Sequence, residues 1–160
     1  METLKIDLKE VPSLTVAAVE CTGSFDEISQ VFMDLFRWVL LSGGKVTSYP
    51  MALFPSPPEQ VPAAGVRFEV CIPVGGRLEP GNGVEIRRIP TAPVAYIRHE
   101  GGYGKVGMSY DRILIWASNN GYEVAGPGRE LYLTNPMQTP EGELVTEIQV
   151  PVKTVESESP

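Results

Sequence analysis

The sequence has little of several features that would point to a specific chemistry. It contains one histidine and two cysteines among 160 residues, which is too few for a multi-histidine metal site or a disulfide framework. Lys and Arg number 13 against 20 Asp and Glu, so the net charge is −7, and no basic stripe is long enough to follow a phosphate backbone. We therefore expect no metal, no cofactor and no direct contact with nucleic acid.

Long apolar segments are also missing. No hydrophobic run approaches the roughly 18 residues that a membrane-spanning helix needs. The N-terminus, Met-Glu-Thr-Leu-Lys, has neither the basic region nor the apolar stretch of a signal peptide. Cys21 and Cys71 then read as reduced thiols in the core or in a pocket. The sequence predicts a cytoplasmic globular protein that does not contact a membrane.

An internal repeat organises the chain. Shifted by 78 positions, residues 6–74 align with residues 84–152 without a gap. The alignment holds fourteen identities, where average composition gives roughly four by chance. We expect a single domain over residues 1–153, with residues 75–83 as the linker between repeats and residues 154–160 as a disordered acidic tail.

Each repeat predicts the same order of elements. A β-branched strand segment leads through a glycine turn into an amphipathic helix, and two further strands flank a proline-rich loop. The expected helices are residues 26–41 and 104–119, and the expected strands are 16–20, 51–54, 66–72, 94–98, 129–133 and 144–150. One helix covers one sheet face, so two such units leave their other faces to form a shared groove. The predicted fold is α+β, with two pseudo-symmetric strand–helix–strand–strand repeats forming a concave antiparallel sheet with a central ligand cleft.

Alternation along the strands predicts which side chains face this groove. The more apolar set of each last strand should pack under the helix. The leucines expected on the helix side are Leu53, Leu131 and Leu133. The residues expected on the groove side include Phe54, Glu69, Glu130, Tyr132 and Glu147, and Tyr96 shares a face with Arg98. The groove should therefore hold aromatic rings around one or two carboxylates.

Several segments together resemble a known family. They are VAYIRHEGGY (94–103), Trp116, NGY (120–122), LYLTNP (131–136) and EIQVPVK (147–153). In this order and spacing they resemble the GyrI-like small-molecule-binding family, which is related to the effector-binding domains of AraC- and MerR-type regulators. The match spans nearly the whole chain. With five residues before its first repeat, the chain is similar to the stand-alone members.

The resemblance implies the duplicated fold and a central cleft for hydrophobic or cationic aromatic small molecules. It also implies a buried glutamate, which best matches Glu147. A buried carboxylate is costly unless it is paired, and a cationic ligand would supply the missing charge and stack on the surrounding rings. The alternative is a solvated Glu147, or one paired with Arg98. Glu69 is its repeat partner, and Arg67 is close enough in sequence to neutralise it.

The aromatic candidates each have an ordinary alternative. Tyr132, Tyr96 and Phe54 could form stacking walls or pack as strand residues usually do. Trp38 and Trp116 lie at the edge of their helix's apolar stripe, where they either pack in the core or lean into the groove.

Two motifs carry no function in this interpretation. Gly102-x-Gly104-x-x-Gly107 matches a dinucleotide fingerprint, but the units are not βαβ crossovers. His99 stands alone in the sequence and aligns with Cys21, which favours a structural role.

Three functions remain open. The first is a binding protein for hydrophobic, aromatic, often cationic compounds. The second, implied by the resemblance, is a hydrolase of cyclopropane-containing toxins that would use Glu147 with Tyr132 or Tyr96. The third is a protein-interaction module of the topoisomerase-inhibiting kind. The sequence also leaves a homodimer open.

Overall fold

A computed structural model describes residues 5–23, 28–54, 66–101, 106–134 and 139–155. The helices are α1 (Ile28–Leu41) and α2 (Val106–Asn119), and Glu141–Glu143 form a 3-10 turn. The strands are β1 (Asp7–Val11), β2 (Leu14–Gly23), β3 (Lys45–Val46), β4 (Met51–Phe54), β5 (Val66–Gly75), β6 (Glu85–Ile89), β7 (Ala92–Glu100), β8 (Tyr122–Val124), β9 (Gly128–Tyr132) and β10 (Val145–Thr154).

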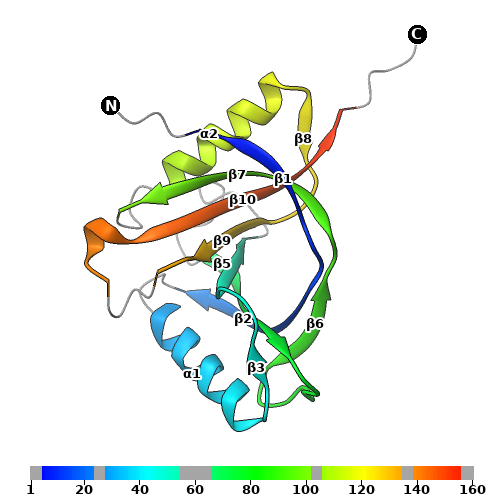
Figure 1. Cartoon of the computed structure of the whole chain (residues 1–160), viewed down its shortest axis with the longest axis vertical. Helices are drawn as coiled ribbons and strands as arrows, with labels where there is room; N and C mark the ends of the chain where they lie inside the picture. Colours follow the sequence, from blue (N-terminus) through cyan, green and yellow to red (C-terminus); the bar gives the residue numbers. More distant parts are fainter. Residues whose placement is uncertain (1–4, 24–27, 55–65, 102–105, 135–138, 156–160) are drawn as a thin grey trace.

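The strands form one curved antiparallel sheet (Figure 1). Its order is β1-β7-β10-β9-β4-β5-β2-β6, while β3 pairs with β5 and β8 pairs with β10. The two halves of the chain meet at the β4–β9 pair in the middle. Each half also gives its first strand to the other, because β1 pairs with β7 and β6 pairs with β2. The predicted α+β fold is confirmed, with four more strands than expected: β1, β3, β6 and β8.

The order of elements in the second half repeats that of the first. The helices begin at Ile28 and Val106 and end at Leu41 and Asn119, so both ends are separated by 78 positions. Gly43 and Gly121 follow the helices with φ of 85° and 80°, the left-handed conformation that a glycine after a helix end readily adopts. That the two halves superpose residue by residue stays a prediction.

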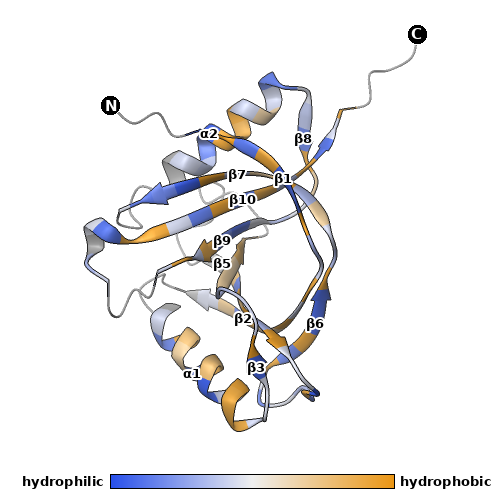
Figure 2. Ribbon diagram, viewed as in Figure 1, coloured by the Kyte–Doolittle hydropathy of each residue, from blue (hydrophilic) through white to orange (hydrophobic). Residues whose placement is uncertain are grey.

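Both helices lie on the same face of the sheet, which we call the helix-bearing face. Leu35 and Val39 of α1 pack on β2 and β5, and Ile113 of α2 packs on β7 and β10. A cross-strand row on this face joins the two packing sites: Val70, Ala52, Glu130, Ile148 and Ile97. In Figure 2 the strands β7 and β10 carry hydrophobic segments, in orange, interrupted by hydrophilic ones, in blue. The central strands β4 and β9 lie between the two packing sites.

The opposite, helix-free face is also buried at its centre. Val16, Ala18, Met51, Leu53 and Cys71 form a second apolar cluster there, and Leu131 packs against it. The expectation that Leu53 and Leu131 face the helices is therefore wrong, and Phe54, Glu130 and Tyr132 lie on the helix-bearing face instead. Leu133 follows the end of β9. All four residues of β4 are buried, so hydrophobicity could not distinguish its two faces.

One smaller expectation, on the C-terminal tail, also changes. Thr154 ends β10 and the backbone N–H of Val155 donates to Gly121, so the first two residues of the expected disordered tail are ordered; residues 156–160 lie outside the described part. Neither helix in the described ranges is long and apolar enough to cross a membrane.

Candidate functional site

Glu130 lies at the centre of the helix-bearing face, on β9 between the two helix packing sites. Its Cα partners on the neighbouring strands are Ala52 and Ile148, which belong to the two apolar cores. The side chain is 4% exposed. Its hydrogen bond comes from the Tyr132 hydroxyl, which donates to Oε1 at 3.2 Å. Among the described residues, no Lys, Arg or His forms an ion pair with it.

Aromatic rings from both helices approach β9 on either side of Glu130. The ring of Phe32 in α1 meets Tyr132 edge-on, with centroids 5.4 Å apart. The ring of Tyr110 in α2 lies against Gly128, so closely that a methyl group at residue 128 would collide with it. Residues 128, 130 and 132 share one face because side chains alternate along a strand. Both helices therefore contribute a ring beside the same carboxylate.

Burial raises the pKa of Glu130 to about 7, and the hydrogen bond from Tyr132 lowers it only in part. A carboxyl group with this pKa is partly protonated at neutral pH. It can accept a proton, or it can ionise when a cation arrives to stabilise the charge.

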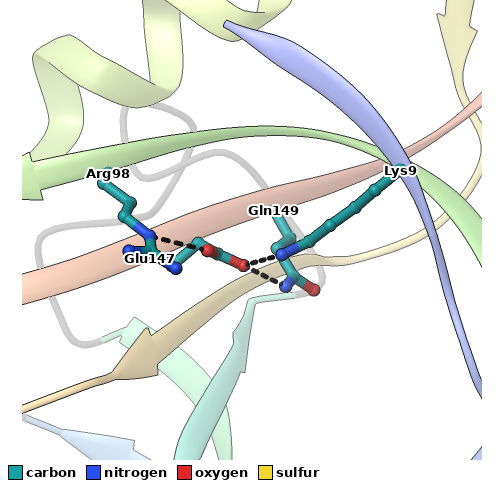
Figure 3. Close-up of polar contacts among 4 residues, drawn as sticks. All are labelled: Lys9, Arg98, Glu147 and Gln149. Carbon is teal, nitrogen blue, oxygen red and sulfur yellow. Dashed lines mark hydrogen bonds and ion pairs between the residues drawn. The ribbon is translucent and has the colours of Figure 1, made fainter. Parts of the chain in front are cut away.

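A second buried carboxylate, Glu147 on β10, occupies the helix-free face. It accepts hydrogen bonds from Lys9 Nζ at 2.7 Å, Gln149 Nε2 at 2.6 Å and Arg98 Nε at 3.2 Å (Figure 3). Lys9 Nζ also lies 4.2 Å from the centroid of the Tyr96 ring. Burial acts to raise the pKa of Glu147, but the hydrogen bonds from Lys9, Gln149 and Arg98 and the charge of Lys9 together lower it.

Glu69 repeats this arrangement in the first half. It forms an ion pair with Arg87 of β6, as Glu147 does with Lys9 of β1. Arg87 and Lys9 are 78 positions apart, as are the two glutamates. Each pair ties an exchanged first strand to the half that receives it. The arrangement is typical of a structural ion pair, in which Arg87 supplies a charge opposite Glu69. The side chain of Arg67, the partner considered from the sequence, lies outside the described part of the structure.

The comparison with protein families agrees with this architecture. A model of the GyrI-like small molecule binding domain matches residues 4–153. The chain belongs to this GyrI-like family. No curated protein matches the sequence significantly.

Solved structures share the GyrI-like fold. The C-terminal domain of EcmrR has a TM-score of 0.87 and 22% identity, covering 96% of this chain and 100% of that one. In the EcmrR–DNA complex, with the same TM-score and identity, the likeness covers 95% of this chain and 58% of the EcmrR chain. A hydrolase encoded by lin2189 from Listeria innocua has a TM-score of 0.67 and 10% identity, covering 93% of this chain and 92% of that one. SAV2435, solved bound to tetraphenylphosphonium, has a TM-score of 0.60 and 15% identity, and the likeness covers 93% of this chain and 94% of that one.

The structure of this GyrI-like domain divides the residues predicted for one groove between two faces. Phe54 and Tyr132 lie on the helix-bearing face with Glu130. Glu147, Glu69 and Tyr96 lie on the helix-free face.

The two tryptophans pack on their own helices' side of the GyrI-like sheet. Trp38 packs against the first core, and Trp116 against the second, where its ring stacks on Tyr122 with centroids 5.8 Å apart. The ordinary interpretation of both tryptophans therefore fits their surroundings. Within the described residues, no three His, Cys, Asp or Glu side chains are grouped to hold a metal ion.

Sequence reasoning named Glu130 as a groove residue but not as a ligand candidate. The sequence did contain a sign of a special role for Glu130, because the aligned residue of the first half, 78 positions earlier, is Ala52. A charge that replaces an alanine in an otherwise equivalent strand is not required by the fold. Phe32 was missed for another reason: its helical spacing is also that of an ordinary core residue.

Proposed function

We propose that this domain binds hydrophobic, aromatic, often cationic small molecules on its helix-bearing face, with Glu130 as the counter-charge. The observation that carries the proposal is the environment of the buried Glu130 carboxylate. It lies beside aromatic rings and accepts a hydrogen bond from a hydroxyl group, but no basic side chain among the described residues pairs with it. A ligand cation would stabilise the ionised Glu130, and the rings of Phe32 and Tyr132 would stack on its apolar part.

The comparisons support this chemistry. The matching family is defined by small-molecule binding, and SAV2435, which has a similar fold, was solved with a hydrophobic aromatic cation. The sequence predicts a ligand-binding role for Glu147 and Glu69 as well. Because each already has a basic partner, we assign them a structural role.

A pair of ions with the same shape and opposite charge tests the proposal. Tetraphenylphosphonium should bind the wild-type protein more tightly than tetraphenylborate. Glu130→Gln should weaken phosphonium binding by tens- to thousands-fold, because losing one partner of a desolvated charge pair costs about 2–5 kcal/mol. Borate binding should not weaken.

Glu147→Gln is the matched control, since it removes a buried carboxylate from the opposite face. It should leave the affinity for both ions unchanged. If Glu130→Gln lowers the affinity for both ions equally, the residue contributes to the shape of the site and not to charge recognition. A selective loss of phosphonium in Glu147→Gln would move the site to the helix-free face.

Hydrolysis is the second candidate, and the Glu130–Tyr132 pair is the observation that favours it. A carboxyl group with a pKa near 7 can act as a general base on water, and the neighbouring hydroxyl can donate to a developing oxyanion. The pairing replaces the Glu147–Tyr132 combination expected from the sequence. After incubation with a cyclopropane electrophile, mass spectrometry should show a hydrolysis product with the wild-type protein and none with Glu130→Gln. If the wild-type protein consumes the compound no faster than buffer alone does, this reaction is excluded.

A further inference from the structure

Three polar side chains form a group beside Tyr132 on the helix-bearing face. Thr146 of β10 is the Cα partner of Tyr132 on one side and of His99 on the other. His99 Nδ1 lies 3.2 Å from the hydroxyl oxygen of Ser109 in α2. All three side chains are buried. Adjacent strands lie about 4.8 Å apart, so Thr146 is one strand and His99 two strands away from Tyr132.

Within the part of the chain that the structure describes, the Thr146 hydroxyl has no hydrogen-bond partner, although the residue is completely buried. A buried polar atom without a partner is destabilising, and a valine would fill the same space without that cost. Packing alone therefore does not explain a threonine at this position.

The repeat provides an internal comparison. The first-half equivalents of Thr146, His99 and Ser109 are Phe68, Cys21 and Val31. Glu130 likewise replaces Ala52. The same fold is thus built with less polar residues at all four positions in the first half. The polar groups gather in the second half, around one end of the proposed binding site.

We propose that Thr146, with the His99–Ser109 pair, is a hydrogen-bonding subsite that adjoins Glu130. The inference rests on the proposed function and narrows the ligand class. The ligand is an extended aromatic cation whose charge meets Glu130 and whose other end carries an amine, amide or hydroxyl group. The Thr146 hydroxyl accepts a hydrogen bond from that group or donates one to it. Thr146 lies one strand spacing, about 5 Å, and the His99–Ser109 pair two spacings, about 10 Å, from the strand that carries Glu130.

Two aromatic cations distinguish this subsite from the charge site. Tetraphenylphosphonium has no hydrogen-bonding group, whereas ethidium carries two primary amines. Thr146→Val should weaken ethidium binding about tenfold and leave phosphonium binding unchanged, both by calorimetric titration. Thr146→Ser, which keeps the hydroxyl, should retain ethidium affinity. Thermal unfolding of the free Thr146→Val protein should show no loss of stability.

The outcomes separate the two proposals. If the wild-type protein binds neither cation, the proposed function fails and the subsite fails with it. If both cations bind and Thr146→Val changes neither affinity, or lowers both equally, the subsite is overturned while the function of Glu130 stands.

A second inference comes from the outer side of α1. Four large apolar residues there are between 44% and 81% exposed: Met33, Phe36, Leu40 and Leu41. They recur at helical spacing, so α1 is apolar on both its inner and its outer side. A helix that is hydrophobic all round is normally buried. The equivalent residues of α2 are Asp111, Leu114, Ser118 and Asn119, so this fold does not require an apolar outer stripe.

The geometry points to a second copy of this chain as the occupant of the α1 stripe. The chain carries a net charge of −7, but Asp34 and Arg37 give α1 a charge of zero, so two acidic copies repel least at this surface. A two-fold axis perpendicular to α1 would pair the helix with itself in antiparallel orientation, which would set the acid of each copy toward the base of the other. A single helix offers less than the roughly 800 Å² per partner of a standard interface, so the dimer should be weak.

Sedimentation velocity from micromolar to millimolar protein tests this interface. The wild-type protein should shift from monomer to dimer, and Phe36→Glu and Leu41→Glu should remain monomeric. Ile115→Glu is the matched control, because Ile115 is an exposed apolar residue of α2. It should dimerise like the wild type. A wild-type monomer at every concentration, or equal loss of the dimer in Ile115→Glu, would overturn the inference.

Discussion

Glu130 and Glu147 are both almost completely buried, yet their surroundings change their pKa values in opposite directions. Glu130 has rings and one hydroxyl, so burial raises its pKa to about 7. Glu147 has Lys9, Arg98 and Gln149, whose hydrogen bonds and charge lower its pKa against the effect of burial. The position of basic residues on the sheet, and not burial, therefore separates the ligand candidate from the structural carboxylate.

This difference predicts opposite effects on stability. The pKa of Glu130 is higher in the folded than in the unfolded protein, so ionisation costs stability as pH rises from about 4.5 through 7. Glu130→Gln should therefore stabilise the free protein by about 1–3 kcal/mol at pH 8 and by less at pH 5. The pKa of Glu147 is lowered, so its contribution is present above the unfolded pKa and is lost as pH falls through the folded value.

Glu147→Gln should thus destabilise the protein at pH 7 by about 1–2 kcal/mol, less than a fully buried pair because Lys9 and Arg98 are partly exposed. Urea unfolding of both variants at pH 5 and pH 8 measures these effects. A loss of stability in Glu130→Gln at pH 8 would contradict the assigned environment of that carboxyl group.

The same pKa predicts how cation binding depends on pH. Below pH 7 a cation must displace the proton of Glu130, so tetraphenylphosphonium affinity should rise up to tenfold per pH unit between pH 5 and pH 7 and then level off. Other titratable groups described on this face are Tyr132, Tyr110, His99, Cys21 and Tyr122. Glu130→Gln should abolish the slope if Glu130 is its source. A slope that persists in this variant would assign it to one of the other groups.

At the scale of elements, local sequence signals located the helices and the central strands. Both helix ends, Leu41 and Asn119, and the strand Met51–Phe54 agree with the prediction. These segments depend on periodicity and on glycine caps, which are local. β1 and β6 were not predicted as strands, because their partners β7 and β2 belong to the other half of the chain.

The candidate site was predicted only in its chemistry, a carboxylate among aromatic rings. Its face was assigned wrongly, because β4 and β9 are buried on both sides and alternation alone does not show which side meets the helices. Likewise, nothing in the sequence of β10 shows that Glu147 accepts a hydrogen bond from Lys9, which is 138 residues away.

The contact of α2 with β9 gives a prediction at this scale. Because a methyl group at residue 128 would meet the buried ring of Tyr110, Gly128→Ala should cost about 1–3 kcal/mol of stability through overpacking. In a Tyr110→Ala background, the same substitution should cost much less. Denaturant unfolding of the four proteins of this cycle gives the coupling between the two positions. Additive effects would show that the ring does not restrict residue 128.

The whole molecule is held together by exchange between its halves. β1 completes the edge of the second half beside β7, β6 completes that of the first half beside β2, and β4 pairs with β9 across the middle. The ion pairs Lys9–Glu147 and Arg87–Glu69 reinforce the two exchanged strands. Two halves with the same order of elements could in principle fold as separate units, but in this topology each half takes a strand from the other.

This topology predicts that neither half folds alone. Residues 1–81 would keep α1 but lose β6 and the β9 partner of β4, leaving two sheet edges unpaired. Residues 82–160 would lose β1 and the Lys9 partner of the buried Glu147. Unpaired edges and an unpaired buried carboxylate are both destabilising, so each fragment should show poorly dispersed amide NMR signals and no cooperative unfolding.

Mixed in equal amounts, the fragments should recover the dispersed spectrum of the intact chain, because the break lies in the exposed segment between β5 and β6. A cooperative unfolding transition in either fragment by itself would show that the exchanged strands are dispensable for folding.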